Sequence, residues 1–449
     1  MDFQATDTIA AIATPPGNGG VGIIRISGAL VTRIAEQLQP TPLLIPRQAH
    51  FSSFRDHHGD IIDSGISLYF PAPASYTGED ILELQAHGGT VVLNMLLRRV
   101  IELGARIARP GEFTERAFLN NKLDLTQAEA VADLITSSTE QAVRSAQNSL
   151  QGVFSEKINQ LVEDLTRLRI YIEAAIDFAD EEIDFLNEGG VEQQLLDLLT
   201  RIHQIQGTAK QGRLLHDGIS VVLAGKPNAG KSSLLNALAG FDAAIVNEIA
   251  GTTRDIIRER IQLNGMPLHI IDTAGLRDSD NAVEQEGIRR AHTEIQKADK
   301  ILLLMDIQDA DPQTAATLLQ TTNNITEVYN KIDLLGLQPS ITNTPTNTKI
   351  YLSVKTGAGI ELLIQHLKDS VGFNESTEHV FIARSRHIEA LAEGHTAVNK
   401  ALDLLRISQT GELVAEELRL AQNALSAITG KFTSDDLLGK IFSSFCIGK

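Results

Sequence analysis

The feature that most constrains this chain is a glycine-rich run, Gly225-Lys226-Pro227-Asn228-Ala229-Gly230-Lys231-Ser232, which fits the phosphate-binding-loop pattern. It stands between an apolar run, Ile219 to Ala224, and a helical pattern over residues 233–239. This is the strand–loop–helix context that the pattern requires. Glycines let backbone N–H groups approach phosphate oxygens, and the start of the helix adds a favourable dipole. We expect Lys231 to reach the β- and γ-phosphates and the Ser232 hydroxyl to ligate Mg²⁺.

Three further motifs follow in the order found in guanine-nucleotide-binding proteins. Asp272-Thr273-Ala274-Gly275 ends an apolar strand, where the carboxylate can hold Mg²⁺ through water and the glycine N–H can meet the γ-phosphate. Asn330-Lys331-Ile332-Asp333 offers a carboxylate to the two donors on the guanine edge, a donor pair that adenine lacks. Ser353-Val354-Lys355 is expected to close over the base. Together the four motifs predict a GTPase domain over residues 218–373.

The segment Gly251-Thr252-Thr253-Arg254-Asp255 lies between the loop and Asp272, the place of a first switch segment. We expect Thr253 to close on Mg²⁺ only while the γ-phosphate is present. Position 276 is Leu, where Ras-type enzymes carry a glutamine that positions water. Hydrolysis therefore requires another residue to hold the water and another cation to offset the transition-state charge.

Length and composition limit the class of protein. A chain of 449 residues is long enough for about three domains. The single cysteine, Cys446, excludes a disulfide framework and fits a reducing cytoplasm. No apolar run approaches about 18 residues, and Met1 to Thr6 lacks the basic and apolar parts of a signal peptide, so neither a membrane span nor secretion is expected. A net charge of −18 argues against a broad phosphate-binding face.

The remaining residues divide into two kinds of sequence. Residues 1–120 mix β-branched runs with glycine turns and an amphipathic helix over Val91–Leu103, which predicts an α/β domain. Residues 121–217 and 374–449 have helical periodicity, with Gly189-Gly190 separating two long helices. We therefore expect an α/β and all-α multidomain chain, in which one helical domain is split by the GTPase insert at 218–373. The expected strands of the first domain are Ile9 to Ala13, Gly22 to Ile26 and Ile66 to Phe70.

Several of these runs resemble the MnmE (TrmE) family of tRNA-modification GTPases. Within the GTPase motifs the resemblance rests on Gly225 to Ser232, Gly251 to Asp255 and Asp272 to Arg277. Elsewhere it rests on the following runs: Ala13 to Gly17, Gly20 to Gly28, Tyr76 to Asp80, Arg109 to Ala117 and Phe445 to Lys449. The resemblance covers essentially the whole chain. It implies an N-terminal folate-binding α/β domain, a discontinuous helical domain and an inserted Ras-like P-loop GTPase domain with a mostly parallel sheet.

The resemblance also implies an activity. Family members form a homodimer through the N-terminal domains and a heterotetramer with the FAD-dependent partner MnmG. Such pairs add an aminomethyl or carboxymethylaminomethyl group to C5 of the wobble uridine of certain tRNAs. The carbon comes from a tetrahydrofolate such as 5-formyltetrahydrofolate. The cofactors implied are thus GTP, Mg²⁺, K⁺ and a folate.

Site residues are carried over position by position. The GTP-binding residues implied are Asn228, Ala229, Gly230, Lys231, Ser232, Ser233, Asn247, Glu248, Ile249, Ala250, Gly251, Thr252, Thr253, Asp272, Thr273, Ala274, Gly275, Asn330, Lys331, Asp333, Ser353, Val354 and Lys355. Mg²⁺ is assigned to Ser232 and Thr253. K⁺, in place of an arginine finger, is assigned to Asn228, Asn247, Ile249 and Thr252. The family usually has Thr where Asn247 stands, but the contact implied is a main-chain carbonyl. Glu284 matches the glutamate that orients water.

Folate contacts carry over to Arg25, Glu83, Lys122 and Lys449. Arg25 and Lys449 suit the glutamate tail or ring carbonyl of an anionic ligand, and Glu83 suits the donor-rich pterin edge. We expect the tail that holds Cys446 to lie near the N-terminal domain of the same or the partner subunit. For Cys446 two roles stay open, thiol catalysis and packing as a small hydrophobe.

Two alternatives to this function use the same motifs. A ribosome-assembly or other RNA-associated GTPase would share all four nucleotide motifs but should carry a basic RNA-binding appendage. The charge of −18 and the Phe445 to Lys449 terminus argue against it. A one-carbon folate enzyme regulated by GTP is the other alternative, and folate binding without turnover in the absence of a partner would disfavour it.

Overall fold

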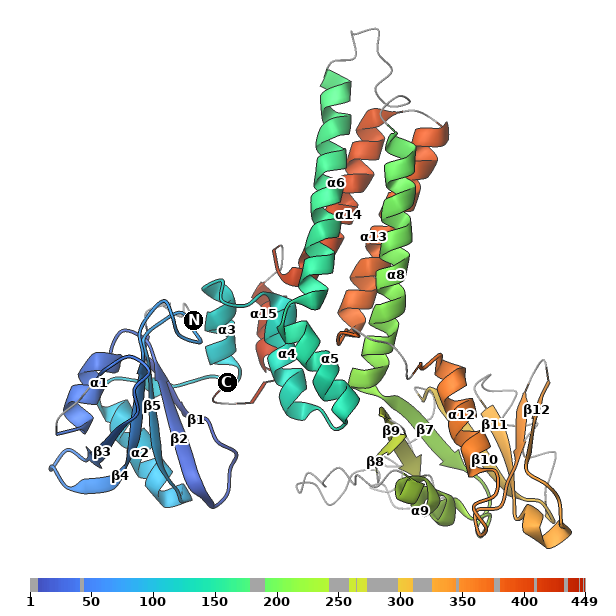
Figure 1. Cartoon of the computed structure of the whole chain (residues 1–449), viewed down its shortest axis with the longest axis horizontal. Coiled ribbons are helices and arrows are strands. Elements are labelled where there is room, and N and C mark those ends of the chain that lie inside the picture. The colour runs from blue at the N-terminus through green and yellow to red at the C-terminus, as the bar shows by residue number, and fades with distance from the viewer. Residues whose placement is uncertain are drawn as a thin grey trace, which may run out of the picture. The chain divides into compact units, whose positions relative to one another are not determined.

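The computed structural model (Figure 1) describes most of the chain as two compact units. Unit 1 comprises residues 1–132, 150–179 and 415–449, and unit 2 comprises residues 133–149 and 180–414. Within these units the described residues are 7–40, 44–177, 190–241, 258–263, 265–272, 298–309, 325–344, 347–374, 380–407, 410–431, 435–443, 445, 446 and 448.

Unit 1 begins with a six-stranded sheet in the order β3-β4-β5-β2-β1-β6. Its strands are β1 Ile9–Ile12, β2 Gly19–Ser27, β3 His50–Arg55, β4 Ile61–Phe70, β5 Ile81–Gly88 and β6 Arg106–Ile107. The pairings are antiparallel except for that of β1 with β6. The strands and the helix expected from the sequence of this part are confirmed, the helix being α2.

Buried apolar residues alternate with charged residues along the two central strands, so the two faces of this sheet differ. Ile24 and Ile26 of β2 are fully buried, with Leu82 and Leu84 of β5, in a core that also takes in the helices α1 (Val31–Leu38) and α2 (Thr90–Glu102). Successive residues of a strand point to opposite faces. The intervening Arg25 and Glu83 therefore project from the other face.

The rest of unit 1 is helical. It contains α3 Glu112–Leu119, most of α4 Leu125–Thr136, α6 Val153–Asp177, most of α14 Gly411–Thr429, and α15 Asp435–Ser443. Phe442 of α15 and Phe445 after it are buried against Leu125 and Ala128 of α4. This apolar contact fixes the end of the chain on the first turns of α4.

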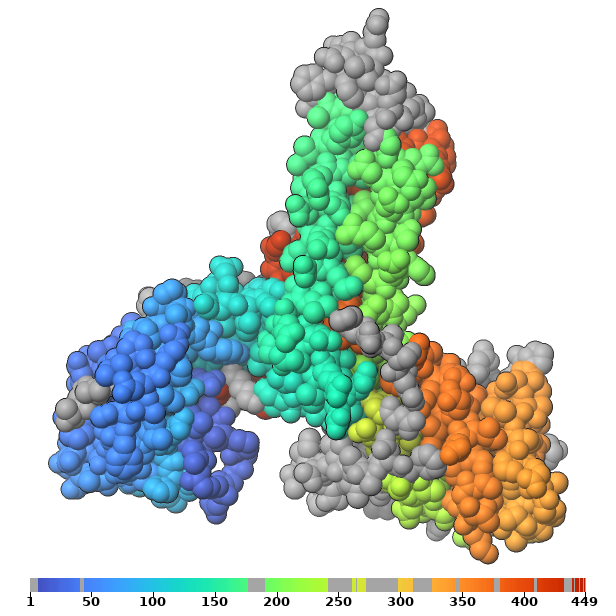
Figure 2. Space-filling model, viewed as in Figure 1, coloured from blue at the N-terminus to red at the C-terminus, as the bar shows by residue number. Residues whose placement is uncertain are grey.

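Unit 2 contains a seven-stranded sheet in the order β12-β13-β11-β10-β7-β9-β8. Its strands are β7 Ile219–Ala224, β8 Arg258–Leu263, β9 Met266–Asp272, β10 Lys300–Asp306, β11 Ile325–Asn330, β12 Ser340–Asn343 and β13 Thr348–Tyr351. The five central strands are parallel, and only the edge strands β8 and β12 are antiparallel to their neighbours. All four residues of β12 are exposed at the edge (Figure 2). The expected mostly parallel, Ras-like sheet is confirmed.

Helices complete unit 2. They are α5 Glu140–Leu150, α8 Val191–Asp217, α9 Lys231–Phe241, the short η1 Ile332–Leu335, α12 Ile360–Val371 and α13 Ser385–Ile407. The two long helices expected around Gly190 are α6 and α8. The sequence pattern did not separate the shorter α4 and α5 from them. None of the helices in the described part of the chain combines the length and apolar composition needed to cross a membrane.

Candidate functional site

The glycine-rich loop joins β7 to α9, as its sequence predicts. Gly225 (φ 145°) and Gly230 (φ 103°) have backbones that side chains rarely adopt. A Cβ on Gly225 would collide with the carbonyl oxygen of Leu304, and one on Gly230 with the amide of Asn330. Asn228 also has positive φ, 66°. Only glycine permits this close curvature at both positions, so the loop has the backbone form of a phosphate cradle.

Lys231 lies within the curve of the loop. Its ammonium donates to the carbonyl oxygens of Gly225 at 2.8 Å and Lys226 at 3.1 Å. Ser232 and Ser233 are exposed in the first turn of α9. A cation inside the loop and hydroxyls at a helix start fit a nucleotide phosphate with its Mg²⁺.

Asn330 connects three of the four motifs. It is 3% exposed, and its amide donates to the carbonyl oxygen of Ala229 in the loop at 2.9 Å. Its side-chain oxygen accepts the N–H groups of Lys331 at 2.8 Å and Val354 at 3.0 Å. These bonds join the phosphate loop, the Asn330–Asp333 motif and the Ser353–Lys355 motif into one surface. The role of Asn330 is therefore to position the others.

Asp333 and Lys331 are each held by one further side chain. Ser353, fully buried, donates its hydroxyl to the Asp333 carboxylate at 2.6 Å, which fixes the orientation of that carboxylate. Lys331 (φ 68°) donates to Asp306 at 2.7 Å, and this hydrogen bond lowers the pKa of Asp306. Sequence reasoning missed Asp306, although an acid ending the apolar run Ile301 to Met305 was the available signal.

Asp272 is the last residue of β9 and pairs in register with Leu223 of β7, one residue before the end of that strand. Its backbone therefore reaches the same edge of the sheet as the loop. The following predicted site residues lie outside the described residues: Asn247, Glu248, Ile249, Ala250, Gly251, Thr252, Thr253, Thr273, Ala274, Gly275, Glu284 and Lys449.

A second group of predicted residues meets on the N-terminal sheet. Arg25 and Glu83 are partners across β2 and β5, and the Arg25 guanidinium donates to Glu83 at 2.9 Å. That guanidinium also lies 5.7 Å from the ring centroid of Tyr76 and 5.8 Å from that of Phe113. Charged groups beside aromatic rings fit a planar heterocycle with polar edges. Lys122 instead donates to the carbonyl oxygen of Pro73 at 3.0 Å.

The C-terminal tail reaches this group from within the same chain. Arg25 donates to the carbonyl oxygen of Gly448 at 3.4 Å, and the Gly111 N–H donates to that of Cys446 at 3.3 Å. Gly448 (φ 96°) packs so closely that an added Cβ would come within 2.6 Å of the Ile12 carbonyl oxygen. The expected position of the tail near the N-terminal domain is thus confirmed, in the same subunit. Cys446 itself is exposed.

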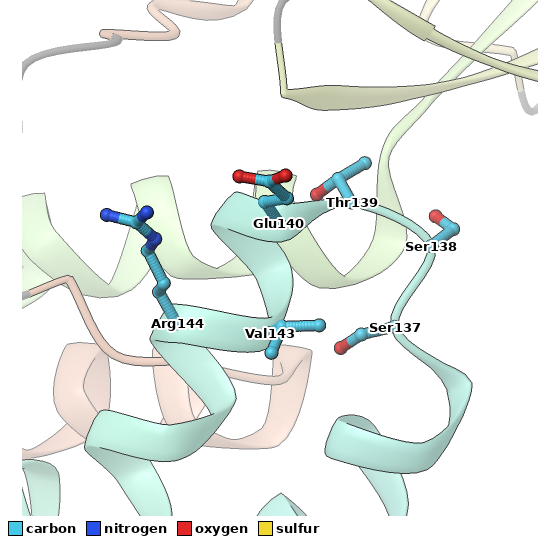
Figure 3. A pocket seen from close by; sticks show the side chains of 6 residues that line it. All are labelled: Ser137, Ser138, Thr139, Glu140, Val143 and Arg144. Atoms are coloured by element: carbon cyan, nitrogen blue, oxygen red, sulfur yellow. The ribbon is translucent and has the colours of Figure 1, made fainter. Parts of the chain in front are cut away.

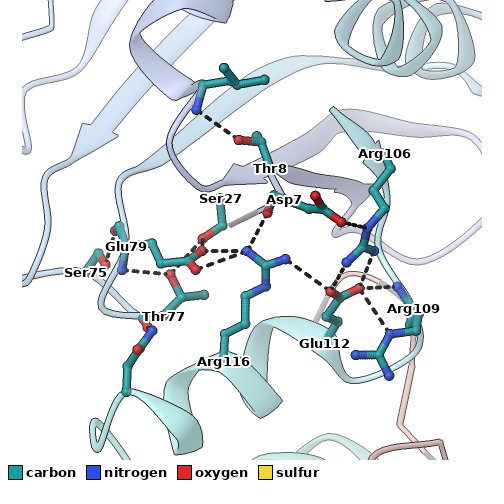
Figure 4. Close-up of polar contacts among 12 residues, drawn as sticks. Asp7, Thr8, Ser27, Ser75, Thr77, Glu79, Arg106, Arg109, Glu112 and Arg116 are labelled. Atoms are coloured by element: carbon teal, nitrogen blue, oxygen red, sulfur yellow. Dashed lines mark hydrogen bonds and ion pairs between the residues drawn. The ribbon is translucent and has the colours of Figure 1, made fainter. Parts of the chain in front are cut away.

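A buried ionic cluster supports that site (Figure 4). Glu112, 2% exposed, binds Arg106 at 2.6 Å and Arg116 at 3.2 Å, and Arg116 also binds Glu79 at 2.9 Å. Burial by itself raises the pKa of Glu112, but Arg106, the Arg109 N–H and Arg116 lower that pKa to about 2. The cluster joins the two sequence runs 76–80 and 109–117, which lie apart in the chain.

Comparison with known proteins gives the family. Residues 8–122 match the family described as GTP-binding protein TrmE N-terminus, and residues 125–446 match the MnmE helical domain. The chain is 56% identical over 455 residues to the tRNA modification GTPase MnmE of Yersinia pseudotuberculosis, covering 100% of both chains. It is 55% identical over 453 residues to that of Hydrogenovibrio crunogenus, again over 100% of both.

Among solved structures, the chain is similar to Era of Aquifex aeolicus with bound GDP and aluminium fluoride, at 22% identity and a TM-score of 0.26, covering 40% of this chain and 66% of that one. It is also similar to the G domain of FeoB of T. maritima, at 23% identity and a TM-score of 0.24, covering 34% of this chain and 96% of that one. The full-length identity to the two curated relatives decides the assignment: the chain belongs to the MnmE family of tRNA modification GTPases.

Proposed function

We propose that this chain is a K⁺-dependent GTPase that, with an FAD-dependent partner of the MnmG kind, adds an aminomethyl or carboxymethylaminomethyl group to C5 of the wobble uridine of certain tRNAs. The name of the two full-length relatives supports the tRNA reaction. The observation that best supports transfer of a one-carbon unit from a folate is the position of the C-terminal tail. The tail lies beside Arg25 and Glu83 and brings the exposed cysteine Cys446 to a site suited to a folate.

The GTP half follows from the loop and its neighbours. Lys231 would bind β- and γ-phosphate oxygens from inside the loop, and Ser232 with Thr253 would hold Mg²⁺. When bound, Mg²⁺ offsets the charge that develops on the phosphates during transfer. Asp333, oriented by Ser353, would accept the two guanine donors and so select GTP over ATP.

The K⁺ requirement follows from Leu276, which cannot orient water, and from the lack of an evident arginine supplied in cis. Asn228, with Asn247, Ile249 and Thr252, would hold K⁺ against the phosphates, and Glu284 would hold the attacking water. Replacing Na⁺ by K⁺ should raise GTP hydrolysis steeply in the native chain. Asn228→Ala should abolish that difference, and equal rates of the native chain in both salts would remove the K⁺ mechanism.

Cys446 is proposed as a functional thiol, since its exposure disfavours the packing role. The reaction is read by mass spectrometry of wobble uridines from a strain that lacks this gene, complemented by the native chain, Cys446→Ser or Cys446→Ala. A functional thiol predicts that both variants lose modification while GTP hydrolysis and 5-formyltetrahydrofolate binding stay near normal. Full modification by Cys446→Ser would leave the cysteine no chemical role.

The proposal is completed by an assembly in the cytoplasm. Two copies of the chain form a homodimer through their N-terminal domains, and this dimer forms a heterotetramer with the MnmG-like partner. Phe51 and Ile66 are cross-strand partners on β3 and β4, and they are 73% and 36% exposed in the single chain. Exposed apolar pairs of this kind support contact with a second copy. Phe51→Ser should shift the mass measured by light scattering toward the monomer. An unchanged dimer mass would move the interface elsewhere.

The domain borders stay as the sequence predicts them, at 1–120, 121–217, 218–373 and 374–449. A ribosome-assembly or other RNA-associated GTPase is the alternative function. It is disfavoured because such a protein would not be expected to match MnmE relatives at 55–56% identity along its entire length.

A further inference from the structure

The end of α8, where the chain enters the GTPase sheet, carries a group of charged side chains that the proposed chemistry does not use. We call Asp133, His216, Asp217 and Arg384 the junction cluster. Asp133, whose side chain is 4% exposed, lies 3.0 Å from His216 Nε2 and 2.6 Å from Arg384 Nη2. The other imidazole nitrogen, Nδ1, lies 2.6 Å from Asp217. His216 thus has a carboxylate at each of its two nitrogens.

The proton on His216 is strongly held. Burial lowers the pKa of the imidazole, but the hydrogen bonds to Asp133 and Asp217 outweigh burial and raise the pKa to about 9. Both ring nitrogens of an imidazolium donate, which matches two carboxylate partners. At neutral pH the junction cluster is therefore a set of two cations and two anions.

Both connections to the GTPase sheet are attached at this place. The outgoing chain passes from Asp217 through Gly218 into β7, and the returning chain is bonded to α8 and α5. Gln211 of α8 accepts the Asn374 N–H at 3.0 Å, and Asn148 of α5 donates to the Val380 carbonyl oxygen at 2.9 Å. The two ends of the GTPase insert are thus attached to the same pair of helices, α8 and α5.

The strand β9 links the junction cluster to the nucleotide site. His269 of β9 is within hydrogen-bond distance, 3.0 Å, of the Asp217 carbonyl oxygen. Three residues further, β9 ends at Asp272, the motif carboxylate. Gly265, in the turn just before β9, lies near α5, since a Cβ added to it would come within 3.4 Å of Gln141 Cβ in the first turn of that helix. β9 therefore meets the junction cluster through His269, follows a turn that lies near the start of α5, and ends in a nucleotide motif.

The turn between α4 and α5 borders a hollow of about 400 Å³, around which the turn and the first residues of α5 are arranged (Figure 3). The residues that line the hollow are Ser137, Ser138, Thr139, Glu140, Val143 and Arg144. The cluster residue Asp133 precedes this turn by four residues, and the Ser137 hydroxyl donates to its carbonyl oxygen at 2.6 Å.

We propose that His216 is a positioning residue whose ion pairs with Asp133 and Asp217 transmit the nucleotide state from β9 to the α4–α5 turn. In this way they couple GTP hydrolysis to tRNA modification. The coupling to modification rests on the proposed function, whereas the transmission along β9 does not. An ionic junction suits this role because a buried charged pair has a defined geometry that is costly to break.

The test compares His216→Gln, which removes the charge, with His216→Arg, which restores a cation with several donors. His203→Gln is the matched control, since His203 is exposed on the same helix. Three quantities are measured on the full-length chain: the rate of GTP hydrolysis in K⁺, wobble-uridine modification with the partner, and hydrogen exchange of residues 133–149 with GDP and with a non-hydrolysable GTP analogue.

We expect the native chain and His203→Gln to exchange differently over residues 133–149 in the two nucleotide states. His216→Gln should lose that difference, keep hydrolysis within about threefold and lower modification by at least about tenfold. His216→Arg should recover part of both losses.

The inference is overturned if the native chain shows no nucleotide-dependent exchange at 133–149, or if His216→Gln retains it. It is also overturned if modification falls only in proportion to hydrolysis. Exchange needs neither tRNA nor partner. A native chain that fails to modify tRNA therefore refutes the proposed function and leaves the exchange result to decide the transmission. If His216→Gln does not fold, Asp133→Asn is measured in its place.

Discussion

Replacing Glu112 by Gln should destabilise the N-terminal sheet and α3 by about 3 kcal/mol. The Glu112 carboxylate accepts two hydrogen bonds from Arg106, at 2.6 and 2.8 Å, and one from the Arg109 N–H at 2.8 Å. Its pKa falls from 4.5 to about 2, because these donors and Arg116 outweigh the effect of burial. One pKa unit corresponds to about 1.36 kcal/mol, so the fall gives about 3 kcal/mol at neutral pH. Breaking a buried ion pair costs a similar amount, about 3–5 kcal/mol.

The pH dependence has a defined sign. The folded pKa lies below the unfolded one, so this stabilisation is fully present above about pH 4.5 and is lost as the pH falls through about 2. The assay is peptide-resolved hydrogen exchange of the full-length chain at neutral pH, read over β1, β5 and α3. No tryptophan is present in the sequence to report unfolding by fluorescence.

Glu115→Gln is the matched control, because Glu115 lies on the same helix and pairs with Arg109 at 2.8 Å. Burial raises the pKa of Glu115 and Arg109 only partly offsets this, so loss of its charge should cost less than about 1 kcal/mol. Equal protection losses in the two variants would refute the reasoning. So would a Glu112→Gln chain with native exchange, since the ion pairs would then contribute nothing net.

Three further outcomes are expected. Asp333→Asn should weaken GTP binding by about 2–4 kcal/mol in calorimetry, because the guanine donors lose their carboxylate, and an unchanged GTP-over-ATP preference would contradict the assignment. Gly448→Ala should lower 5-formyltetrahydrofolate affinity about tenfold with normal GTP hydrolysis, because the Cβ would press on the Ile12 carbonyl and move the tail. The folded pKa of His216 exceeds its ordinary 6.5, so its stabilisation, about 1–3 kcal/mol, is complete below pH 6.5 and lost as the pH rises through about 9. The melting temperature of the native chain should therefore fall over that range more than that of His216→Gln.

The backbone of the phosphate-binding loop and the strand and helix on either side of it were predictable because their geometry is local. The glycines of the loop set the backbone, the apolar runs on either side set the strand and helix, and parallel strands bring their carboxyl ends to one edge. Motif order alone proposes Asp333 and Ser353 for the base, and the structure shows their side chains in hydrogen-bond contact. What the motifs did not reveal is that Asn330 holds three of them together, since its hydrogen bonds lie inside the folded chain.

The residues proposed for the N-terminal site came only from family resemblance. Arg25 and Gly448 are 423 positions apart, and no periodicity relates them. Pattern reasoning gave the strands that carry Arg25 and the buried Ile24 and Ile26, but not the cross-strand register that pairs Arg25 with Glu83. Lys122 illustrates the limit, because a lone lysine in a sequence cannot show that it bonds to the Pro73 carbonyl.

The junction cluster is a second case of such non-local assembly, and its place explains how it could matter. Asp133 lies 83 residues from His216 and 251 from Arg384, and these residues meet where α8 packs against α13, on either side of the inserted GTPase sheet. Parallel strands put the nucleotide motifs at one end of the sheet and the cluster at the other. β9 has seven residues, whose first and last Cα atoms are about 20 Å apart at about 3.3 Å per step, and it is paired on both sides by β7 and β8. Transmission along β9 requires that a strand paired in this way move as a unit, so that a displacement at Asp272 reaches His269 and the Asp217 backbone.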